Sequence, residues 1–240
     1  MTSVIVLQDV SHRFDSKEVL SEITLHIPKG EIFGLLGPSG SGKTTLIKLV
    51  TGLLEPTSGD VYMNGEKMPS LAQMKRYGFM AQSDALYQEL SGKENLDFFA
   101  SIYRLKKQEK KRRIKELLEM VNLTEVADHP VDTYSGGMKR RLSLAAALLH
   151  EPEMIILDEP TVGIDPVLRQ SIWKELNRLK DHGVTIIVTT HVMDEAEKCD
   201  RLAMLREGRI IAMNTPADLR EEIGADTIEE VFLHYGGASQ

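Results

Sequence analysis

The sequence predicts an α/β fold with a mostly parallel core sheet, and two observations support this prediction. Residues 154–157 and 184–190 are short apolar runs, and residues 167–180 between them have helical spacing. This order is that of a βαβ unit, whose parallel strands are apolar because both faces of the sheet are covered. Residues 31–36 form a third apolar run, and a helical pattern follows over residues 44–54.

The N-terminal segments have the patterns of half-buried strands. Residues 4–10 read as a strand, and residues 21–28, SEITLHIP, alternate apolar and polar side chains. The sequence GDVYMNG, residues 59–65, ends in Asn64-Gly65, which is a hairpin turn signal. We therefore expect an N-terminal antiparallel β subdomain.

The helical segments are predicted from the spacing of their apolar residues. Residues 44–54 place one apolar face toward the core, and this face comprises Leu46, Ile47, Leu49, Val50, Leu53 and Leu54. Helical spacing also covers residues 95–115 and 114–121, and the second segment has a plain apolar stripe of Ile114, Leu117, Leu118 and Val121. After Arg209 we expect a short strand and two short helices near residues 217–223 and 227–234.

A basic run, KKQEKKRR, occupies residues 106–113. We expect it to form a solvated helix face, because most charge runs do so. The alternative is contact with an anionic membrane surface.

Composition limits the classes of protein that this chain can belong to. Its 240 residues suffice for one large domain or for a domain with an inserted lobe, and 42% are hydrophobic. The formal net charge of −7 disfavours a nucleic-acid binder. The single Cys199 cannot form an internal disulfide, which favours a reducing compartment. We see no signal peptide and no apolar run of the roughly eighteen residues needed to cross a bilayer, so another chain would have to span any membrane involved.

The sequence GPSGSGKT, residues 37–44, fits the phosphate-binding pattern G-x-x-x-x-G-K-[ST]. It lies between a predicted buried strand and a predicted helix, as that loop requires. Backbone N–H groups of the glycine-rich turn and the positive end of the helix can surround phosphate oxygens. Lys43 can reach the outer phosphates, and the Thr44 hydroxyl can hold Mg²⁺. A chance match is improbable with both flanks in place, so the chain is predicted to be a P-loop NTPase.

The sequence MIILDE, residues 154–159, supplies acidic groups for such a site. The buried strand brings Asp158 to the carboxyl edge of the sheet, where it would hold the hydration shell of Mg²⁺. Glu159 follows in a position to polarise an attacking water. Lys43 and Asp158 are 115 residues apart, whereas a minimal βαβ step needs about thirty. The chain between them therefore includes an inserted lobe, whose latter part is helical.

A second helix start with anion-binding character lies in TYSGGMKRRLSLAAALL, residues 133–149. Ser135 is a good helix N-cap, and two glycines leave the first N–H groups bare. Lys139, Arg140 and Arg141 follow in the region where the helix dipole disfavours cations. The expected electrostatics suit an incoming polyphosphate, and an ordinary capping role for Ser135 is compatible with this.

With these motifs in order, the chain resembles the ATP-binding subunits of ABC transporters over nearly its whole length. The residues that carry the resemblance are GPSGSGKTT, Gln82 in YGFMAQ, YSGGM, MIILDEP, GID and His191. The implied fold is a P-loop NTPase of the ABC type. The implied cofactors are ATP and Mg²⁺.

The resemblance implies a head-to-tail dimer with two shared ATP sites, which answers why one chain has two phosphate-binding helix starts. The segment Ser135, Gly136, Gly137 and Met138 of one chain would close over the ATP held by the phosphate loop of the other. The ATP-binding residues would be Phe14, stacking on adenine, with Gly37, Pro38, Ser39, Gly40, Ser41, Gly42, Lys43, Thr44 and Thr45. An aromatic residue at a strand end is more often a packing residue, so Phe14 has that alternative.

Catalytic roles follow from the same resemblance. Glu159 would be the general base, His191 would contact the γ-phosphate, and Lys43 would bind the phosphates. Gln82 would reach Mg²⁺ and the attacking water and would sense the membrane partner. The metal ligands would be Thr44, Gln82 and Asp158. Asp165 would lie in the loop that crosses the dimer interface.

The signature segment departs from the usual Leu-Ser-Gly-Gly-Gln. Tyr134 replaces the leucine and Met138 the glutamine, and a methionine cannot donate the amide hydrogen bond of a glutamine. Because Ser135 and the backbone N–H groups remain, we expect activity to survive. The forms YSGGMKRR, TVGIDP and TIEEVFLHYGG are similar to the export-type branch of the family.

The resulting prediction is one ABC ATP-binding domain over residues 1–240. Residues 1–84 and 152–215 would form the nucleotide-binding core with the β subdomain, and residues 85–151 the inserted helical subdomain. Residues 216–240 would form C-terminal helices. The implied partners are a second copy of this chain and integral membrane permease subunits, with no nucleic acid, at the cytoplasmic face of the cell membrane.

Two other functions stay open on sequence grounds. A soluble ABC-type ATPase is the first, although the chain has neither the long heptad insertion of repair types nor the two cassettes of translation types. Another P-loop enzyme, a kinase or GTPase, is the second. A GTPase would need an Asn-Lys-x-Asp guanine reader, which the chain lacks, and neither class explains residues 135–138.

Overall fold

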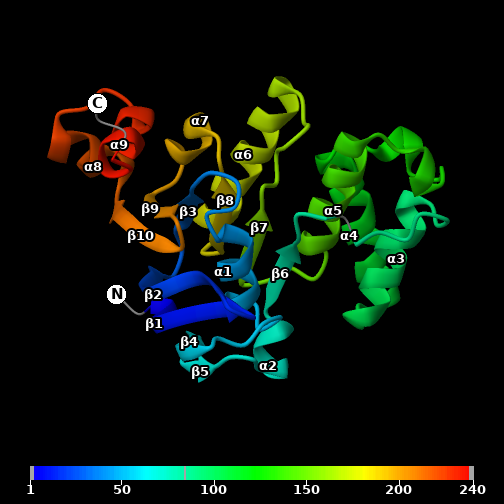
Figure 1. The fold of residues 1–240 in the computed structure, drawn as a ribbon. Coiled ribbons are helices and arrows are strands. Elements are labelled where there is room, and N and C mark those ends of the chain that lie inside the picture. Colours follow the sequence, from blue (N-terminus) through cyan, green and yellow to red (C-terminus); the bar gives the residue numbers. More distant parts are fainter. Residues whose placement is uncertain (1–2, 84, 238–240) are drawn as a thin grey trace.

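Two β-sheets form the centre of the chain in a computed structural model that describes residues 3–83 and 85–237 (Figure 1). The smaller sheet has the order β2-β1-β4-β5 and is antiparallel. Its strands are β1 (Ser3–Phe14), β2 (Lys17–Pro28), β4 (Ser58–Met63) and β5 (Glu66–Lys67). The predicted turn joins β4 to β5, and both Asn64 and Gly65 have positive φ, as such a hairpin needs. The N-terminal antiparallel sheet is thus confirmed.

The larger sheet has the order β10-β9-β3-β8-β7-β6, and only β10 runs antiparallel to its neighbour. Its strands are β3 (Ile32–Leu36), β6 (Tyr77–Met80), β7 (Met154–Asp158), β8 (Thr185–Thr190), β9 (Arg201–Arg206) and β10 (Arg209–Asn214). Helix α6 (Pro166–Asp181) connects β7 to the adjacent parallel β8. The predicted βαβ unit and the α/β fold class are therefore confirmed.

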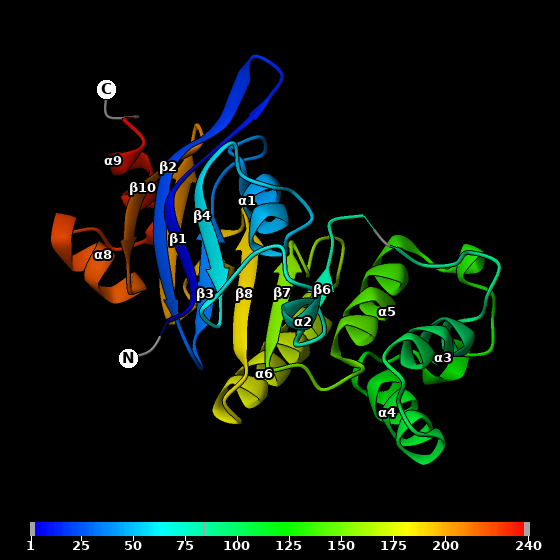
Figure 2. The ribbon, with the colours of Figure 1, turned by 90° about the horizontal axis from the view of Figure 1, so that it is seen from below.

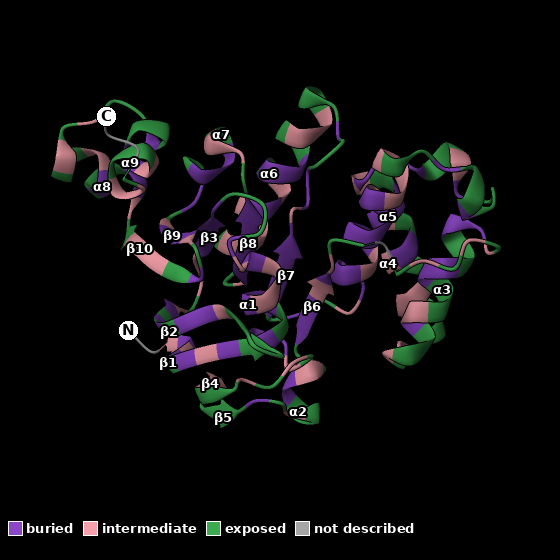
Figure 3. Cartoon of the chain, in the orientation of Figure 1, coloured by how far each residue is buried: buried purple, intermediate pink, exposed green. Residues whose placement is uncertain are grey.

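The central strands are buried on both faces because each face packs against a different layer. Ile155, Leu157 and Ile186 belong to a core cluster with α6 and the helical lobe. Ile156 and Ile187 point the other way, into a cluster with α1 (Lys43–Val50) and the antiparallel sheet. Alternation along each strand therefore supplies two cores, which explains why these strands read as continuous apolar runs (Figures 2 and 3).

The helices between β6 and β7 form a lobe at the β6 edge of the large sheet (Figures 1 and 2). The lobe contains α3 (Gly92–Ile102), α4 (Lys107–Met120), the 3-10 turns Thr124–Val126 and Val131–Thr133, and α5 (Gly136–Leu148). The remaining helices are α2 (Leu71–Met74), α7 (Met193–Ala196), α8 (Pro216–Ile223) and α9 (Ile228–Tyr235). Helices α8 and α9 lie beyond β10, at the opposite edge of the sheet (Figure 1). The division into subdomains stays a prediction, and its boundary at residue 84 lies outside the described residues.

Two predicted helices differ from those in the structure. The helix expected over residues 44–54 ends at Val50, because Gly52 adopts a φ of 73° and the N–H groups of Leu53 and Leu54 both bond to Lys48 O. Leu53 is consequently 57% exposed instead of buried.

The continuous helix expected over residues 95–115 is two helices. Arg104 has a left-handed φ of 58°, and Leu105 N bonds to Ala100 O, which closes α3 before α4 begins. All of the basic run at residues 106–113 except Lys106 thus lies in the first half of α4. Among the described residues, no helix has the length and apolar character needed to cross a membrane.

Candidate functional site

The phosphate loop joins the end of β3 to the start of α1, as its sequence predicts. Gly40 and Gly42 have φ values of 80° and 107°, which favour glycine. A Cβ on Gly37 would lie 2.4 Å from Leu205 O, so a side chain cannot be accommodated there. Lys43 Nζ donates to Gly37 O at 2.6 Å and to Pro38 O at 3.0 Å. The ammonium group is thereby folded back along the loop, inside the concavity that its N–H groups form.

Asp158 is placed beside Thr44 at the ends of two elements that meet at the carboxyl edge of the sheet. Thr44 Oγ1 donates to Asp158 Oδ2 at 2.9 Å, and Thr189 Oγ1 donates to Asp158 Oδ1 at 2.5 Å. Asp158 is 1% exposed, so both hydroxyls hold its carboxylate in one orientation. Thr44 and Asp158, two of the predicted Mg²⁺ ligands, therefore lie close together.

Glu159 points toward both Lys43 and His191. Its Oε1 lies 3.8 Å from Lys43 Nζ and 3.1 Å from His191 Nδ1. Its backbone has a φ of 53°, and its N–H is held by Thr189 O and Thr189 Oγ1 at 3.2 and 3.0 Å. Burial lowers the pKa of Lys43, and the carboxylates of Glu159 and Asp158 oppose that decrease.

A cavity of about 200 Å³ lies at this point. It is lined by Val19, Ser39, Gly40, Gly42, Lys43, Thr44, Thr45, Gln82 and Glu159. Gln82 is an exposed residue whose side chain borders the same space as Lys43 and Glu159. The sequence did not identify Val19, which has no motif signal and is brought here by the turn into β2. Eight of the nine lining residues had been predicted as site residues.

Some predicted residues lie away from this cavity. Phe14 is 47% exposed at the end of β1, with its ring edge against His12 at 4.7 Å between centroids. Pro38 is exposed, and Ser41 is buried with no hydrogen-bond partner for Oγ among the described residues. Asp165 caps α6, since its Oδ1 accepts from Leu168 N at 3.0 Å.

The segment at residues 135–138 opens α5 and does not line the cavity of its own chain's phosphate loop. The Ser135 hydroxyl accepts from Met138 N at 3.3 Å, which confirms it as an N-cap. Nothing lies within 4 Å of a Cβ built on Gly136. A Cβ on Gly137 would lie 2.8 Å from Gly163 O, so residues 137 and 163 approach closely. The helix start is thus open to solvent and rests against the loop before α6.

The cations after this segment do not form the expected seat for an anion. Arg140 is 6% exposed and donates to the carbonyl oxygens of Ala81, Gln82, Asp158 and Glu159. Its neighbours are also engaged within the chain: Lys139 donates to Gln88 Oε1 at 2.9 Å, and Arg141 to Val121 O and Asn122 O at 2.8 and 3.0 Å. For the buried Arg140 the expectation that its charge faces an incoming polyphosphate is wrong, because this side chain joins the lobe to the site instead.

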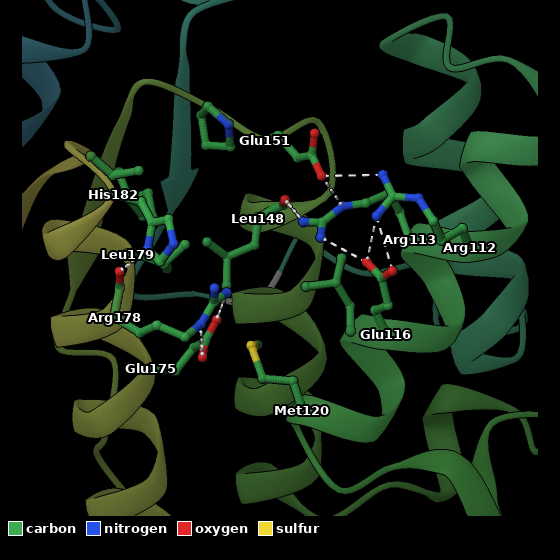
Figure 4. A pocket seen from close by; sticks show the side chains of 14 residues that line it. Arg112, Arg113, Glu116, Met120, Leu148, Glu151, Glu175, Arg178, Leu179 and His182 are labelled. Atoms are coloured by element: carbon green, nitrogen blue, oxygen red, sulfur yellow. Dashed lines mark hydrogen bonds and ion pairs between the residues drawn. The ribbon is translucent and has the colours of Figure 1, made fainter.

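Another cavity, of about 740 Å³, lies between α4, the end of α5 and α6 (Figure 4). Its charged groups pair with one another. Arg112 and Arg113 pair with Glu116 and Glu151, while Arg178 pairs with Glu175. Each guanidinium that lines this cavity therefore has a carboxylate partner within the chain.

Thr44 and Asp158 suit Mg²⁺ chemically. Mg²⁺ is usually held by one or two carboxylates together with waters and substrate phosphates, and not by a cage of protein ligands. One hydroxyl and one carboxylate at the phosphate loop match that pattern. Within residues 3–83 and 85–237, no cluster of three or more His, Cys, Asp or Glu could hold a metal by itself. Fold and site together define a P-loop nucleotide-binding protein.

Comparison with known proteins identifies the family within that class. The ABC transporter family matches residues 20–162. The chain is 39% identical over 238 residues to the "Probable multidrug ABC transporter ATP-binding protein YbhF" of Escherichia coli K12, covering 96% of this chain and 41% of that protein. It is 42% identical to the linearmycin resistance ATP-binding protein LnrL of Bacillus subtilis 168, covering 94% of this chain and 74% of that protein.

Solved structures agree. An ATP-binding subunit of an ABC transporter superposes with a TM-score of 0.90 at 30% identity, covering 98% of this chain and all of that one. An ATP-binding cassette solved as a dimer in a post-hydrolysis state, bound to ADP and Pi, gives a TM-score of 0.82 at 29% identity, covering 88% and 98%. The chain belongs to the ABC transporter family, and it spans about two fifths of the length of YbhF.

Proposed function

We propose that this chain binds and hydrolyses Mg-ATP and thereby powers export through separate membrane subunits. The observation that carries the proposal is the convergence of Lys43 and His191 on one oxygen of Glu159, at 3.8 and 3.1 Å. This arrangement lies beside a phosphate loop whose threonine bonds to Asp158. It brings a phosphate-binding cation, a base and a metal ligand to one cavity.

Each residue has a role that fits its position. Lys43 would leave Gly37 O and Pro38 O to contact the outer phosphates, and backbone N–H groups of the phosphate loop would surround these phosphates. Thr44, Asp158 and Gln82 would hold Mg²⁺, which supplies charge neutralisation between the phosphates when bound. Phe14 is exposed enough for an adenine to stack on it.

Glu159 would act as the general base toward an attacking water. Such a group typically contributes 10²–10⁴-fold to the rate. His191, 44% exposed at its side chain, would reach toward the γ-phosphate while its Nδ1 faces Glu159. The positive φ of Glu159 orients its carboxylate into the cavity at a local cost that the Thr189 contacts offset.

The start of α5 at residues 135–138 would bind the ATP held by a second copy of this chain. The Ser135 hydroxyl and the N–H groups near Gly136, Gly137 and Met138 lie at the start of α5, where Ser135 and Gly136 are exposed, outside their own chain's cavity. The positive end of α5 suits a γ-phosphate offered by another chain. Asp165 lies next to that surface, at the start of α6. The dimeric form of a similar cassette is consistent with this assembly.

A role in transport fits the names of two similar proteins, the probable multidrug ABC transporter ATP-binding protein YbhF and the linearmycin resistance ATP-binding protein LnrL. The chain would act through permease subunits at the cytoplasmic face of the cell membrane. An exposed aromatic edge provides a place for such a partner. Tyr87 and Phe98 are 46% and 39% exposed, in edge-to-face contact at 4.7 Å, and Ile102 is 59% exposed one turn further along α3. This edge follows Gln82 in the chain, so a docked partner could affect the site.

The proposal is tested by comparing wild-type protein with Glu159→Gln in Mg-ATP. The variant keeps the shape of the side chain but loses the base, so we expect phosphate release to fall by about 10²-fold or more. Light scattering should then show a stable dimer of the variant. A persistent monomer with bound nucleotide would contradict the shared site, and undiminished hydrolysis would contradict the role of Glu159.

The transport part of the proposal needs a separate experiment. A tagged copy of the chain is purified from gently solubilised native membranes, and the proteins that accompany it are identified. We expect a multi-span membrane protein at equal or half stoichiometry. Only soluble partners, from a preparation that keeps other membrane complexes intact, would favour an ABC ATPase that is not coupled to transport.

A further inference from the structure

A buried carboxylate that the proposed chemistry does not use lies behind the site. Glu195, on the short helix α7, is 1% exposed. Thr190 Oγ1 donates to its Oε2 at 2.7 Å, and the Thr161 hydroxyl donates to its Oε1. Arg169 Nε lies 3.9 Å from Oε1. Residues from three other segments thus contact the two oxygens of this buried carboxylate.

Each of these segments carries a residue of the proposed site or interface. Thr190 is the last residue of β8 and precedes His191. Thr161 lies two residues after Glu159. Arg169 is in the first turns of α6, where its N–H bonds to Asp165 O at 2.9 Å.

The contact at Thr190 bears directly on the histidine. Its hydroxyl donates to Glu195 and accepts from Val192 N at 3.0 Å, so it bridges the backbone on both sides of His191. Without the carboxylate, that hydroxyl loses its acceptor in a buried environment, and the turn that aims His191 at Glu159 is released.

The Arg169 contact differs in kind from the two threonine contacts. Arg169 Nε is buried and has no hydrogen-bond partner among the described residues. Its Nη2 reaches Ile164 O at 3.4 Å, next to Asp165. The ion pair with Glu195 is therefore a second contact, beside that of the Thr161 hydroxyl, between this carboxylate and the segment that leads from β7 into α6.

We propose that Glu195 is a positioning residue that holds the strand ends bearing Glu159 and His191 in mutual register and links them to the loop of Asp165. This inference rests on the proposed function, because its purpose is to fix the attack geometry. Misplacing a reacting group by about 1 Å can cost 10²-fold in rate. Glu195 touches neither nucleotide nor water in this assignment and acts only through its partners.

Two isosteric variants of one strand provide the test. Thr190→Val removes the hydroxyl that bridges His191. Thr185→Val changes the first residue of β8, at the end of the strand opposite to Thr190 and the site. It removes a hydroxyl of similar burial, which accepts a hydrogen bond from Gly30 N at 2.9 Å. Glu195→Gln is the third variant and keeps the volume of the side chain while removing its charge.

The first measurement is the imidazole NMR signal of His191 in nucleotide-free protein, assigned with His191→Gln. We expect Thr190→Val and Glu195→Gln to move and broaden this signal, and Thr185→Val to leave it in place. The second is the ATPase rate, for which we expect kcat to fall about 10- to 100-fold in the same two variants with little change in KM.

An unmoved His191 signal in both variants overturns the inference, whatever the hydrolysis rates. Equal losses of kcat in Thr185→Val and Thr190→Val also overturn it, because they would reflect general destabilisation. A moved signal in a protein whose wild type hydrolyses no ATP supports the positioning contacts and overturns the proposed function instead.

Discussion

Replacing Arg140 with alanine tests how the helical lobe is held to the site. In the structure its Nη1 donates to Ala81 O and Gln82 O at 2.7 and 2.8 Å. Its Nε and Nη2 donate to Glu159 O at 3.2 and 2.7 Å, and Nη2 also donates to Asp158 O. One buried side chain of α5 thus satisfies carbonyl groups on the strand ends of both β6 and β7.

The expected loss follows from those bonds. A hydrogen bond from a charged donor contributes about 1.5–3 kcal/mol net, and stranding a buried acceptor adds about 1–3 kcal/mol. The carbonyls of residues 81 and 82 lie in a loop and can be rehydrated, whereas those of residues 158 and 159 end a buried strand. We therefore expect Arg140→Ala to lower the free energy of unfolding by about 3–5 kcal/mol.

The assay is urea unfolding, with Arg141→Ala as the matched control. Arg141 also donates to carbonyls, those of Gly137, Val121 and Asn122, but it is only partly buried and Asn122 is exposed, so that carbonyl can be rehydrated. We expect about 1–2 kcal/mol for the control. Equal losses in the two variants, or a loss below about 1 kcal/mol for Arg140→Ala, would refute the claim that this guanidinium fastens the lobe.

Three further outcomes follow from single contacts. Gly137→Ala should lower the melting temperature because its Cβ would meet Gly163 O at 2.8 Å. Gly136→Ala, with open space around it, should leave the melting temperature unchanged or raise it. Equal effects of the two substitutions in calorimetry would count against this close approach. Burial lowers the pKa of His150 from its ordinary value of about 6.5 to about 4. The unfolded chain therefore binds the proton first, and stability should fall as the pH drops from about 6.5 toward 4. His150→Phe should flatten that pH dependence in urea titrations at pH 7 and 5, and an unchanged slope would exclude His150 as its source. Burial raises the pKa of Cys199, so its thiol should react with a disulfide reagent only at the rate of unfolding, and fast labelling of the native protein would contradict its burial.

Strands with a continuous apolar run or a clear alternation could be predicted from the sequence, whereas β6 and β9 could not. Strands β3, β7 and β8 are continuous apolar runs, and each was predicted to within about one residue. Strand β6 has only four residues and includes Gly78, where a Cβ would lie 1.9 Å from Ala147 O. Its place is fixed by the close approach of α5, a long-range contact with no local pattern. Strand β9 begins and ends with arginine and is specified by its pairing with β3.

The break between α3 and α4 had no local signal either. Residues 103–106 contain neither glycine nor proline, and the surrounding sequence has good helix formers. Arg104 nevertheless takes a left-handed conformation. The turn lets Lys110 of α4 reach Asp97 of α3 at 2.6 Å, and it lets both helices bury apolar residues in one cluster. Tertiary packing outweighs helix propensity here because propensity differences are only a few tenths of a kcal/mol per residue.

The candidate site was more predictable than the fold because its motifs specify backbone geometry. Lys43, Thr44, Asp158, Glu159 and His191 lie together as the motif order implied. Their roles toward ATP stay predictions. Glu195 carries no motif signal of its own, and its importance emerges only from which strand ends its carboxylate meets.

The cations of α5 show whether the helix dipole or hydrogen bonding decides where a charged side chain lies. A favourable or unfavourable charge near a helix terminus is worth about 0.3–1 kcal/mol, whereas each bond from the Arg140 guanidinium to a carbonyl is worth about 1.5–3 kcal/mol. The carbonyls at the ends of β6 and β7 therefore hold Arg140 inside the protein. These bonds outweigh the unfavourable interaction of its charge with the helix dipole. What remains for an anion is the Ser135 hydroxyl and the N–H groups beside Gly136, where nothing lies within 4 Å of the missing side chain. If a phosphate binds at this helix start as proposed, its attraction would come mainly from the backbone N–H groups and the Ser135 cap, which is consistent with Met138 in place of the usual glutamine.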